Sequence, residues 1–136
     1  MSELAPKGDV GGASKKDVGK APIWRGMINY FPRAMWAVSM VSDFGQRKYG
    51  AWGGWRDVPD CIERYRDAHG RHMFKQAMGE VYDDTDSGMS HLAHDAWNAL
   101  AKLEKAIQEG KVEVRVGNEI VDGKPVLGTA YAVTLP

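Results

Sequence analysis

An apolar stripe near the middle of the sequence is its most restrictive folding signal. The members of the stripe recur every three or four positions: Leu92, Ala96, Leu100, Leu103 and Ile107. This spacing places side chains along one side of an α-helix. Ser87 and Ser90 are candidate N-caps before the stripe, and Gly110 is a stop signal after it. The pattern predicts an amphipathic helix between these points.

Two further helices are predicted upstream of the stripe. Pro32 suits the first turn of a helix, and apolar residues then recur at helical spacing until Tyr49 and Gly50. After the glycine-punctuated loop AWGGW, a second helix is predicted from near Pro59 to Gly79. The sequence therefore predicts a mainly α fold whose last two helices form a hairpin.

The two ends of the sequence lack helical patterns. Residues 1–19 are rich in Gly, Ser, Lys and Asp, and we expect a flexible arm there. The tail, residues 111–136, contains short β-branched segments and the turn signal Asp122-Gly123, which predict a small β-hairpin. Between them, residues 20–110 are expected to form an all-α domain.

The composition limits the classes of function. The chain has 136 residues, enough for one domain, and its 18 basic and 18 acidic side chains give a formal net charge of zero. A protein that binds DNA usually carries a basic excess, so DNA is not expected as a partner.

Cys61 is the single cysteine, which is typical of a reducing cytoplasm, and we expect it to be a plain small hydrophobe. No apolar run approaches about 18 residues, and no hydrophobic signal region begins the sequence, so we expect a cytoplasmic protein without a membrane segment.

The segment between the second and third predicted helices concentrates ionisable groups. GEVYDDTDSGMSHLAHD, residues 79–95, holds five carboxylates and two histidines in 17 residues. Polar side chains of both helices flank its aspartates at helical spacing: His72, Gln76 and Glu80 on one helix, and His91, His94, Asp95, Asn98 and Lys102 on the other. Hard oxygen ligands with nearby imidazoles suit Mg²⁺ or Mn²⁺ better than a structural zinc ion.

A solvated, well-capped turn explains the same residues. Acidic groups before a helix N-terminus are favoured by the helix dipole, and Ser or Asp there caps free amides. The spacing leaves both interpretations open. All four histidines fall between positions 69 and 94, and this concentration favours the metal site. Similarly, Lys48 and Arg71 could grip phosphate oxygens, and Tyr49 and Trp55 could stack on a base, although such residues are more often surface cations and core lids.

Several short motifs carry a resemblance to a known family. They are Gly19-Lys20-Ala21-Pro22 with Pro32, Phe44-Gly45-x-x-Lys48-Tyr49-Gly50, Trp55-Arg56, Asp67-Ala68-x-x-Arg71-His72, Gly79-Glu80, and Asp84-x-Asp86-Ser87-Gly88-x-Ser90-His91-Leu92-Ala93-His94. In these motifs the sequence resembles the phage-encoded dATP/dGTP diphosphohydrolases, relatives of the MazG-like nucleotide pyrophosphohydrolases. Within that family it is most similar to the MazZ type, from phages that replace adenine with 2-aminoadenine. The resemblance spans about Asp17 to Glu104.

The resemblance implies a fold, a reaction and a set of site residues. The fold would be a MazG-like bundle of helical hairpins that assembles into a homodimer or homotetramer. The reaction would be hydrolysis of a deoxynucleoside triphosphate, dGTP or else dATP, to the monophosphate and pyrophosphate, with two or more Mg²⁺ or Mn²⁺ ions. The dGMP would supply synthesis of the 2-aminoadenine nucleotide. The residues implied are, as catalytic groups, Glu80, Asp84 and His91; as metal ligands, Glu80, Asp83, Asp84, His91, His94 and Asp95; and as substrate contacts, Lys20, Lys48, Tyr49, Trp55, Arg71, His72 and Asn98.

Departures from the family pattern leave two alternatives. Gly54 stands where relatives usually have Asn, Asp95 is commonly Ala, and the tail from Lys111 lies outside the resemblance. The dipeptide His94-Asp95 could belong to an HD-type phosphohydrolase, but that class needs a later Asp on a helix, and the only one is Asp122 in the predicted turn. The other alternative is a phage protein that binds nucleotides or has a structural role without catalysis.

Overall fold

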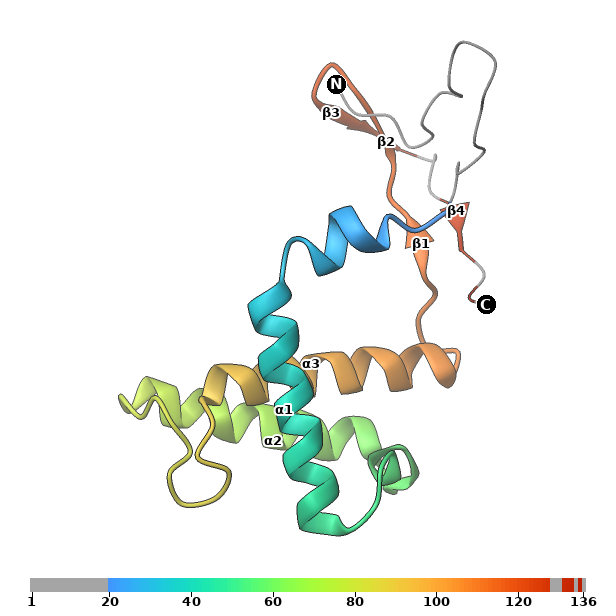
Figure 1. Ribbon diagram of the computed structural model, residues 1–136. Coiled ribbons are helices and arrows are strands. Elements are labelled where there is room, and N and C mark those ends of the chain that lie inside the picture. The colour runs from blue at the N-terminus through green and yellow to red at the C-terminus, as the bar shows by residue number, and fades with distance from the viewer. Residues whose placement is uncertain (1–19, 128–130, 134, 136) are drawn as a thin grey trace. The chain divides into compact units, whose positions relative to one another are not determined.

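A computed structural model describes residues 20–127, 131–133 and 135 (Figure 1). The chain divides into two compact units: a helical unit of residues 23–111, and a second unit that contains residues 1–22 and 112–136. The flexible arm expected over residues 1–19 lies outside the described residues.

The first long helix of the helical unit is α1, Pro32–Tyr49, as predicted from its two end residues. Pro32 occupies the first turn, where the missing N–H needs no partner. At the other end, Gly50 adopts a left-handed conformation (φ +80°) and donates its N–H to the Gln46 carbonyl at 2.8 Å. One wide π-helical turn, Trp24–Ile28, precedes α1.

The second and third long helices are α2, Cys61–Ala77, and α3, His91–Gln108. A short 3₁₀ turn, η2 (Gly54–Asp57), precedes α2. Of the two candidate caps of α3, the structure uses Ser90, whose Oγ accepts a hydrogen bond from the Ala93 N–H at 3.1 Å. Both predicted helices are therefore confirmed, with ends shifted by about two residues, within the usual uncertainty of helix boundaries.

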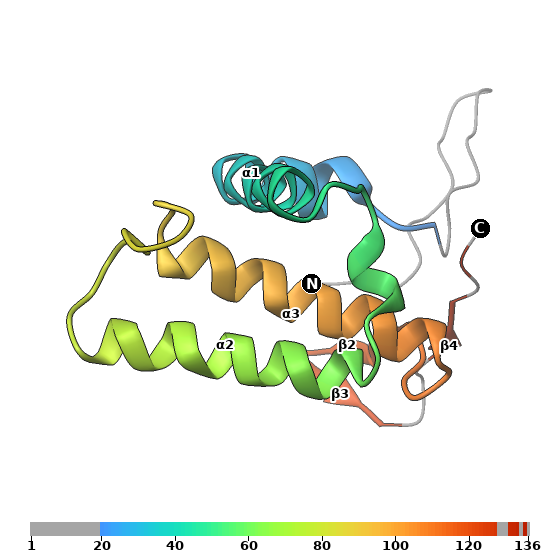
Figure 2. The same ribbon diagram turned by 90° about the horizontal axis from the view of Figure 1, so that it is seen from below.

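Helix α3 lies between the other two helices. Figure 1 shows α2 and α3 as an antiparallel hairpin that α1 crosses, and Figure 2, with α1 seen nearly end-on, shows α3 between α1 and α2. On the side of α1, the Trp97 Nε1–H donates to Ser42 Oγ at 2.9 Å. On the side of α2, the ring of Trp97 packs edge-on against Tyr65 and Trp55. Trp97 thus joins all three helices.

The polar side of α3 faces inward and its apolar stripe faces outward. The buried residues of the helix are His91, Ala93, His94, Asn98 and Ala101. By contrast, Leu92, Leu100 and Leu103 are 69%, 54% and 53% exposed. The stripe predicted from the sequence exists, but in a single chain it does not form the core.

The second unit contains two small antiparallel ladders. Strand β1, Arg115–Val116, pairs with β4, Tyr131–Ala132, while β2, Glu119–Val121, pairs with β3, Lys124–Val126. The predicted turn joins β2 to β3, with positive φ at both Asp122 (51°) and Gly123 (75°), as a two-residue hairpin requires. The mainly α fold with a small C-terminal β-hairpin is confirmed. Among the described residues, no helix combines the length and apolar character needed to cross a membrane.

Candidate metal centre

The segment between α2 and α3 closes on itself as a hairpin-like loop. Tyr82 and Ser90 form an antiparallel bridge, and the Asp83 N–H donates to the Met89 carbonyl at 2.8 Å. The loop turns back at Gly88, which has φ +75° and donates its N–H to the Asp83 carbonyl at 2.7 Å. The backbone of Asp83 is therefore fixed from both sides, and the residue as a whole is only 4% exposed.

Three ionisable side chains from three successive segments meet beside this loop. His72 of α2, Asp83 of the loop and His94 of α3 can each offer one ligand atom, and these atoms lie within 4.8 Å of one another. The rings of His72 and His94 stack with centroids 4.3 Å apart and planes 4° from parallel. We call His72, Asp83 and His94 the trio. Two imidazoles and a carboxylate in a shielded position are a donor set for a divalent ion.

Burial keeps the two imidazoles of the trio unprotonated. The pKa of His72 is lowered to about 4, mainly by burial, and the neighbouring His94 and His91 act in the same direction. Burial also lowers the pKa of His94. At neutral pH each ring therefore has a free lone pair, which a metal ligand needs.

The carboxylate of Asp83 is incompletely compensated. The nearest cation is Lys75, whose Nζ lies 3.7 Å from Asp83 Oδ1. That oxygen is buried and has no hydrogen-bond partner among the described residues. An orphaned carboxylate oxygen beside two neutral imidazoles fits a bound cation, because the cation would satisfy all three groups.

Glu80 and His91 determine which nitrogen of His72 is free. His91 is fully buried, its Nδ1 lies 2.8 Å from His72 Nδ1, and its Nε2 lies 3.3 Å from Glu80 Oε2. His91 Nε2 has no hydrogen-bond partner among the described residues, but a proton on it would face the Glu80 carboxylate. In the tautomer with that proton on Nε2, Nδ1 of His91 accepts a hydrogen bond from Nδ1–H of His72. His72 Nε2 then carries the lone pair, as in carboxylate–histidine–metal arrangements.

Ser87 orients the other imidazole. Its Oγ lies 2.6 Å from His94 Nε2 and accepts a hydrogen bond from the Met89 N–H at 3.1 Å. A hydroxyl oxygen can accept a second hydrogen bond from His94 Nε2–H, which leaves Nδ1 of His94 for a ligand. The sequence indicated Ser87 only as a candidate helix cap. Its place in the motif Asp86-Ser87-Gly88 was the available signal of another role.

Asp95 and Asn98 form a further polar layer along α3. Gln76 donates a hydrogen bond to Asp95, and His69 Nε2 lies 3.8 Å from Asp95 Oδ1. Lys102 Nζ lies 3.0 Å from His69 Nδ1, which directs the other ring nitrogen toward Asp95. Asn98 is buried and donates to the His94 carbonyl at 2.8 Å. These contacts fix the hairpin around the trio, and Asp95 points toward Gln76 and His69.

The remaining predicted site residues have varied surroundings. Asp84 is exposed in the loop. Lys48, at the end of α1, binds both oxygens of Asp86 at 3.0 and 3.1 Å, and its ammonium lies over the ring of Tyr49, which is 76% exposed.

Arg71 is exposed on α2. Trp55 packs in the aromatic cluster described above, and Lys20 belongs to the other unit. The roles predicted for these residues stay predictions.

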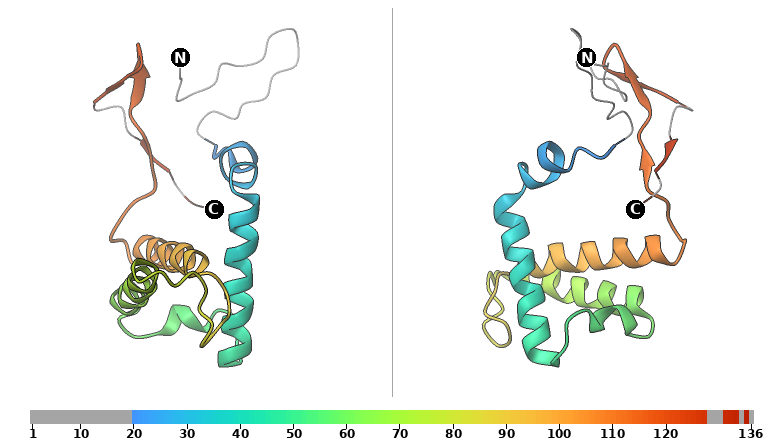
Figure 3. Two further views of the ribbon diagram at one scale, coloured as in Figure 1. Left: turned by 90° about the vertical axis from the view of Figure 1, so that its left-hand side faces the viewer. Right: turned by 45° about the vertical axis from the view of Figure 1, so that its right-hand side comes forward.

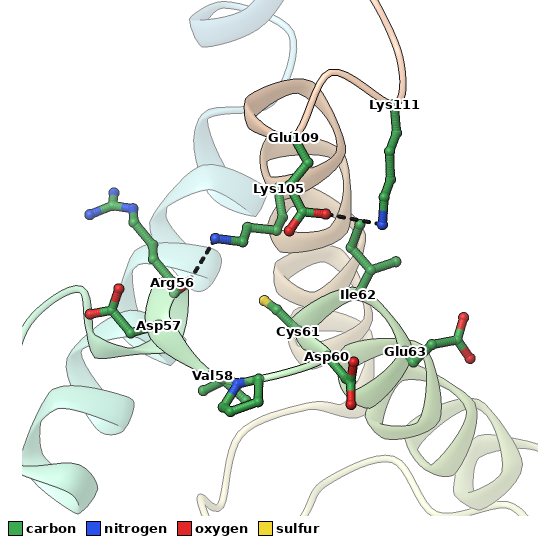
Figure 4. A pocket seen from close by; sticks show the side chains of 11 residues that line it. Arg56, Asp57, Val58, Asp60, Cys61, Ile62, Glu63, Lys105, Glu109 and Lys111 are labelled. Carbon is green, nitrogen blue, oxygen red and sulfur yellow. Dashed lines mark hydrogen bonds and ion pairs between the residues drawn. The ribbon is translucent and has the colours of Figure 1, made fainter.

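A separate surface pocket lies at the opposite end of α2 from the acidic loop (Figure 4). It measures about 480 Å³. Two of its cations are already engaged, since Lys105 donates to the Arg56 carbonyl at 2.8 Å and Lys111 pairs with Glu109 at 3.0 Å. Cys61 in its wall is buried, and burial raises the pKa of its thiol, which keeps it protonated. The pocket is also lined by Asp57, Asp60, Glu63 and Glu109, but these carboxylates do not form a cluster that could hold a metal ion, whereas the trio is such a cluster among the described residues.

The fold and the site together define a small, mainly helical protein with imidazoles and carboxylates gathered inside a helical hairpin. The family model described as "dATP/dGTP diphosphohydrolase, N-terminal" matches residues 11–115. The chain therefore belongs to the dATP/dGTP diphosphohydrolase family, as the motifs in the sequence indicated. Neither the curated proteins nor the solved structures contain a match to the chain.

Proposed function

We propose that the protein hydrolyses a purine deoxynucleoside triphosphate to the monophosphate and pyrophosphate, with Mg²⁺ or Mn²⁺ bound at the trio. The observation that carries this proposal is the convergence of His72, Asp83 and His94, whose ligand atoms lie within 4.8 Å of one another. The family supports the choice of substrate, because its description names dATP and dGTP.

The donors of the trio favour Mn²⁺ over Mg²⁺. Manganese accepts imidazole nitrogen as well as carboxylate oxygen, whereas magnesium prefers oxygen alone. When bound, such an ion lowers the pKa of a water molecule and neutralises charge on phosphate oxygens. Asp84, exposed in the loop next to Asp83, is the donor that we propose for a second ion.

The other side chains prepare the site and neutralise the triphosphate. Glu80 and His91 hold His72 with Nε2 free, and Ser87 holds His94. Lys75, beside Asp83, and Lys48, at the rim of the loop, supply positive charge for the phosphate oxygens of the leaving pyrophosphate. Exposed Arg71 on α2 can add a two-point contact.

Within the family we propose the MazZ type of activity. The motifs from Gly79-Glu80 to His94 support this subdivision. In this proposal the substrate is dGTP, and the product dGMP supplies synthesis of the 2-aminoadenine nucleotide.

The test is an incubation of the purified protein with each dNTP and NTP, with Mn²⁺, Mg²⁺ or EDTA, followed by ion-exchange separation of the products. We expect metal-dependent conversion of dGTP to dGMP and pyrophosphate. Release of deoxyguanosine and triphosphate would favour the HD-type alternative instead. Absence of turnover with every nucleotide and metal would overturn the proposal.

Two substitutions locate the activity at the trio. We expect Asp83→Asn and His72→Gln to lower turnover by at least about 100-fold. Losing an outer partner of a metal ligand costs about 10–100-fold, and losing a direct ligand should cost at least the upper value. Asp57→Asn is the matched control, because Asp57 is an exposed carboxylate on η2, at the other pocket. Equal loss of activity in all three variants would point to a general structural effect rather than to the trio.

A further inference from the structure

A surface pocket of about 560 Å³ lies on the outer side of α2, and all its lining residues belong to that helix: Arg66, Asp67, Gly70, Arg71, Phe74 and Lys75. Successive residues of an α-helix are about 100° apart around its axis, so this side lies opposite His69, His72 and Gln76, which contact α3. Figures 2 and 3 show α3 along the inner side of α2 and α1 beyond α3. Neither helix therefore covers this pocket, which we call the α2 pocket.

Gly70 forms the floor of the α2 pocket. Its neighbours one turn away along the helix are Arg66 and Phe74, and because Gly70 has no side chain, a gap remains between them. A Cβ atom added at Gly70 would meet nothing within 4 Å, so the gap is open. Phe74 borders the gap and is 66% exposed. An exposed aromatic ring beside an open gap is a surface on which a planar base can stack.

The charged residues of the α2 pocket are arranged as a nucleotide requires. Arg71 and Lys75 are one turn apart, and Lys75 also connects the pocket to the trio, since its Nζ lies 3.7 Å from Asp83 Oδ1. Phosphate oxygens held by these two cations would therefore lie between the pocket and the trio. Asp67 is the one carboxylate among the lining residues, and within the described part of the chain it makes no ion pair. It is thus available to accept hydrogen bonds from a ligand.

We propose that the α2 pocket binds the guanine base of the substrate, stacked on Phe74 above Gly70, with Asp67 as the residue that selects guanine over adenine. This inference rests on the proposed function, whose substrate it places on the protein. Guanine presents N1–H and its exocyclic N2–H₂ group as donors, and a carboxylate accepts from both. Adenine has an acceptor at N1 and no amino group beside it, so its lone pair would face the carboxylate without a hydrogen bond.

Gly70→Leu tests the position of the base, because it fills the gap without meeting the rest of the protein. Leucine also favours a helix more than glycine does, so the variant should melt at the wild-type temperature or above it. We nevertheless expect its KM for dGTP with Mn²⁺ to rise by about 10-fold, and Phe74→Ala should have a similar effect through the loss of stacking. Met73→Ala is the matched control, since Met73 is 55% exposed on the same helix but does not line the pocket.

Asp67→Asn tests the selection of guanine. We expect the ratio of kcat/KM for dGTP to kcat/KM for dATP to fall by about 10-fold or more, because an amide cannot accept two hydrogen bonds from guanine as the carboxylate does. Asp60→Asn, an exposed carboxylate before α2 and outside this pocket, should keep the wild-type ratio. An unchanged ratio in Asp67→Asn would overturn the role of Asp67.

A titration with dGMP, followed in ¹H–¹⁵N spectra, tests the pocket without any turnover. We expect the amide signals of Gly70 and Phe74 to shift in the wild type, and the shifts to be lost in Gly70→Leu. Absence of shifts at these amides, or a Gly70→Leu protein with the wild-type KM for dGTP, would overturn the α2 pocket while turnover of dGTP still upheld the proposed function. A wild type that binds dGMP at these amides but hydrolyses no nucleotide would overturn the proposed function alone.

Discussion

His91 is the only side chain among the described residues that is large and completely buried, and it is polar. Buried polar atoms are usually paired: Nδ1 of His91 pairs with His72, whereas Nε2 lies 3.3 Å from Glu80 Oε2 and makes no hydrogen bond among the described residues. Glu80 itself is about a third exposed. In the proposed metal centre, Glu80 would act on the ion only through the rings of His91 and His72, as a positioning residue.

Glu80→Gln is expected to leave the fold intact and to lower the affinity for Mn²⁺ by about 10–100-fold, the usual cost of losing an outer partner of a metal ligand. Turnover should be abolished at low metal concentration. Titration calorimetry measures the affinity, and long-range ¹H–¹⁵N spectra report whether His91 still carries its proton on Nε2. Glu63→Gln, on an exposed position that pairs with Arg66, is the control. Unchanged affinity in Glu80→Gln would show that Glu80 has no part in the centre.

The lowered pKa of His72 predicts a loss of stability in acid. The ring has a pKa of about 4 in the folded protein and about 6.5 when unfolded. Between these values the unfolded chain binds more protons, so the free energy of unfolding falls as the pH falls from about 6.5 toward 4. Because His72 is partly exposed, we expect a loss of about 1–2 kcal/mol between pH 7 and pH 4.5 rather than the full value.

Urea unfolding of the metal-free protein at several pH values measures this loss. His72→Gln should show a smaller decrease over the same range, because glutamine does not titrate. His94 contributes in the same direction, since burial also lowers its pKa. An identical pH dependence in His72→Gln and the wild type would mean that other groups cause the acid sensitivity.

At the scale of the elements, the helices could be predicted from residues at their ends and from periodicity. Pro32 and Gly50 mark the two ends of α1 for steric reasons that act within one turn. Ser90 caps α3 by accepting a hydrogen bond from the nearby Ala93 N–H. Which side of each helix is buried inside this chain could not be predicted in this way. Periodicity shows that Leu92, Leu100 and Leu103 share a side, but not whether that side meets this chain or another.

The membership of the trio was only partly predictable for a related reason. The sequence predicts Asp83 and His94 as ligands and His72 as a substrate contact, and it predicts Asp84 both as a ligand and as a catalytic group. The distinction between the two aspartates depends on the bridge between Tyr82 and Ser90, which directs Asp83 inward and leaves Asp84 exposed. Helical spacing contains no information about how a loop closes.

Trp97→Ala should lower the free energy of unfolding by about 2–4 kcal/mol, because it removes a large side chain from the contact of three helices. The substitution leaves Ser42 Oγ without its donor and opens a space between Trp55 and Tyr65. Chemical denaturation followed by circular dichroism measures the change. Trp52→Ala, at a loop position that is 69% exposed, should change stability by no more than about 0.5 kcal/mol. Equal effects of the two substitutions would contradict a structural role for Trp97.

At the scale of the whole molecule, metal binding should appear as added stability. Three segments supply the trio, and unfolding separates them, so an ion that binds only the folded chain stabilises it. At 100 times its dissociation constant, Mn²⁺ should raise the free energy of unfolding by about 2.7 kcal/mol. A thermal melt with Mn²⁺, and again after addition of EDTA, measures the effect. Asp83→Asn should melt at the same temperature in both conditions, whereas a wild type indifferent to Mn²⁺ would contradict the metal centre.

The overall class of fold was predictable from the sequence, but the detail of the second unit was not. The mainly α character followed from three periodic segments, and the Asp122-Gly123 turn followed from its residues. The predicted hairpin is present as β2 and β3, and a second ladder that was not predicted pairs β1 with β4. Strands of two or three residues carry too few alternating side chains to specify such pairing.

The closeness of the trio along the chain has a consequence for folding kinetics. His72 and His94 are 22 positions apart (94 − 72 = 22), whereas the contact of Ser42 with Trp97 spans 55 positions. Loop closure costs less entropy for short separations, and local contacts form faster than distant ones. The hairpin of α2 and α3 should therefore close before α1 docks on it. In this order the proposed ligands of the trio come together in a nascent chain while the rest of the helical unit is still unfolded.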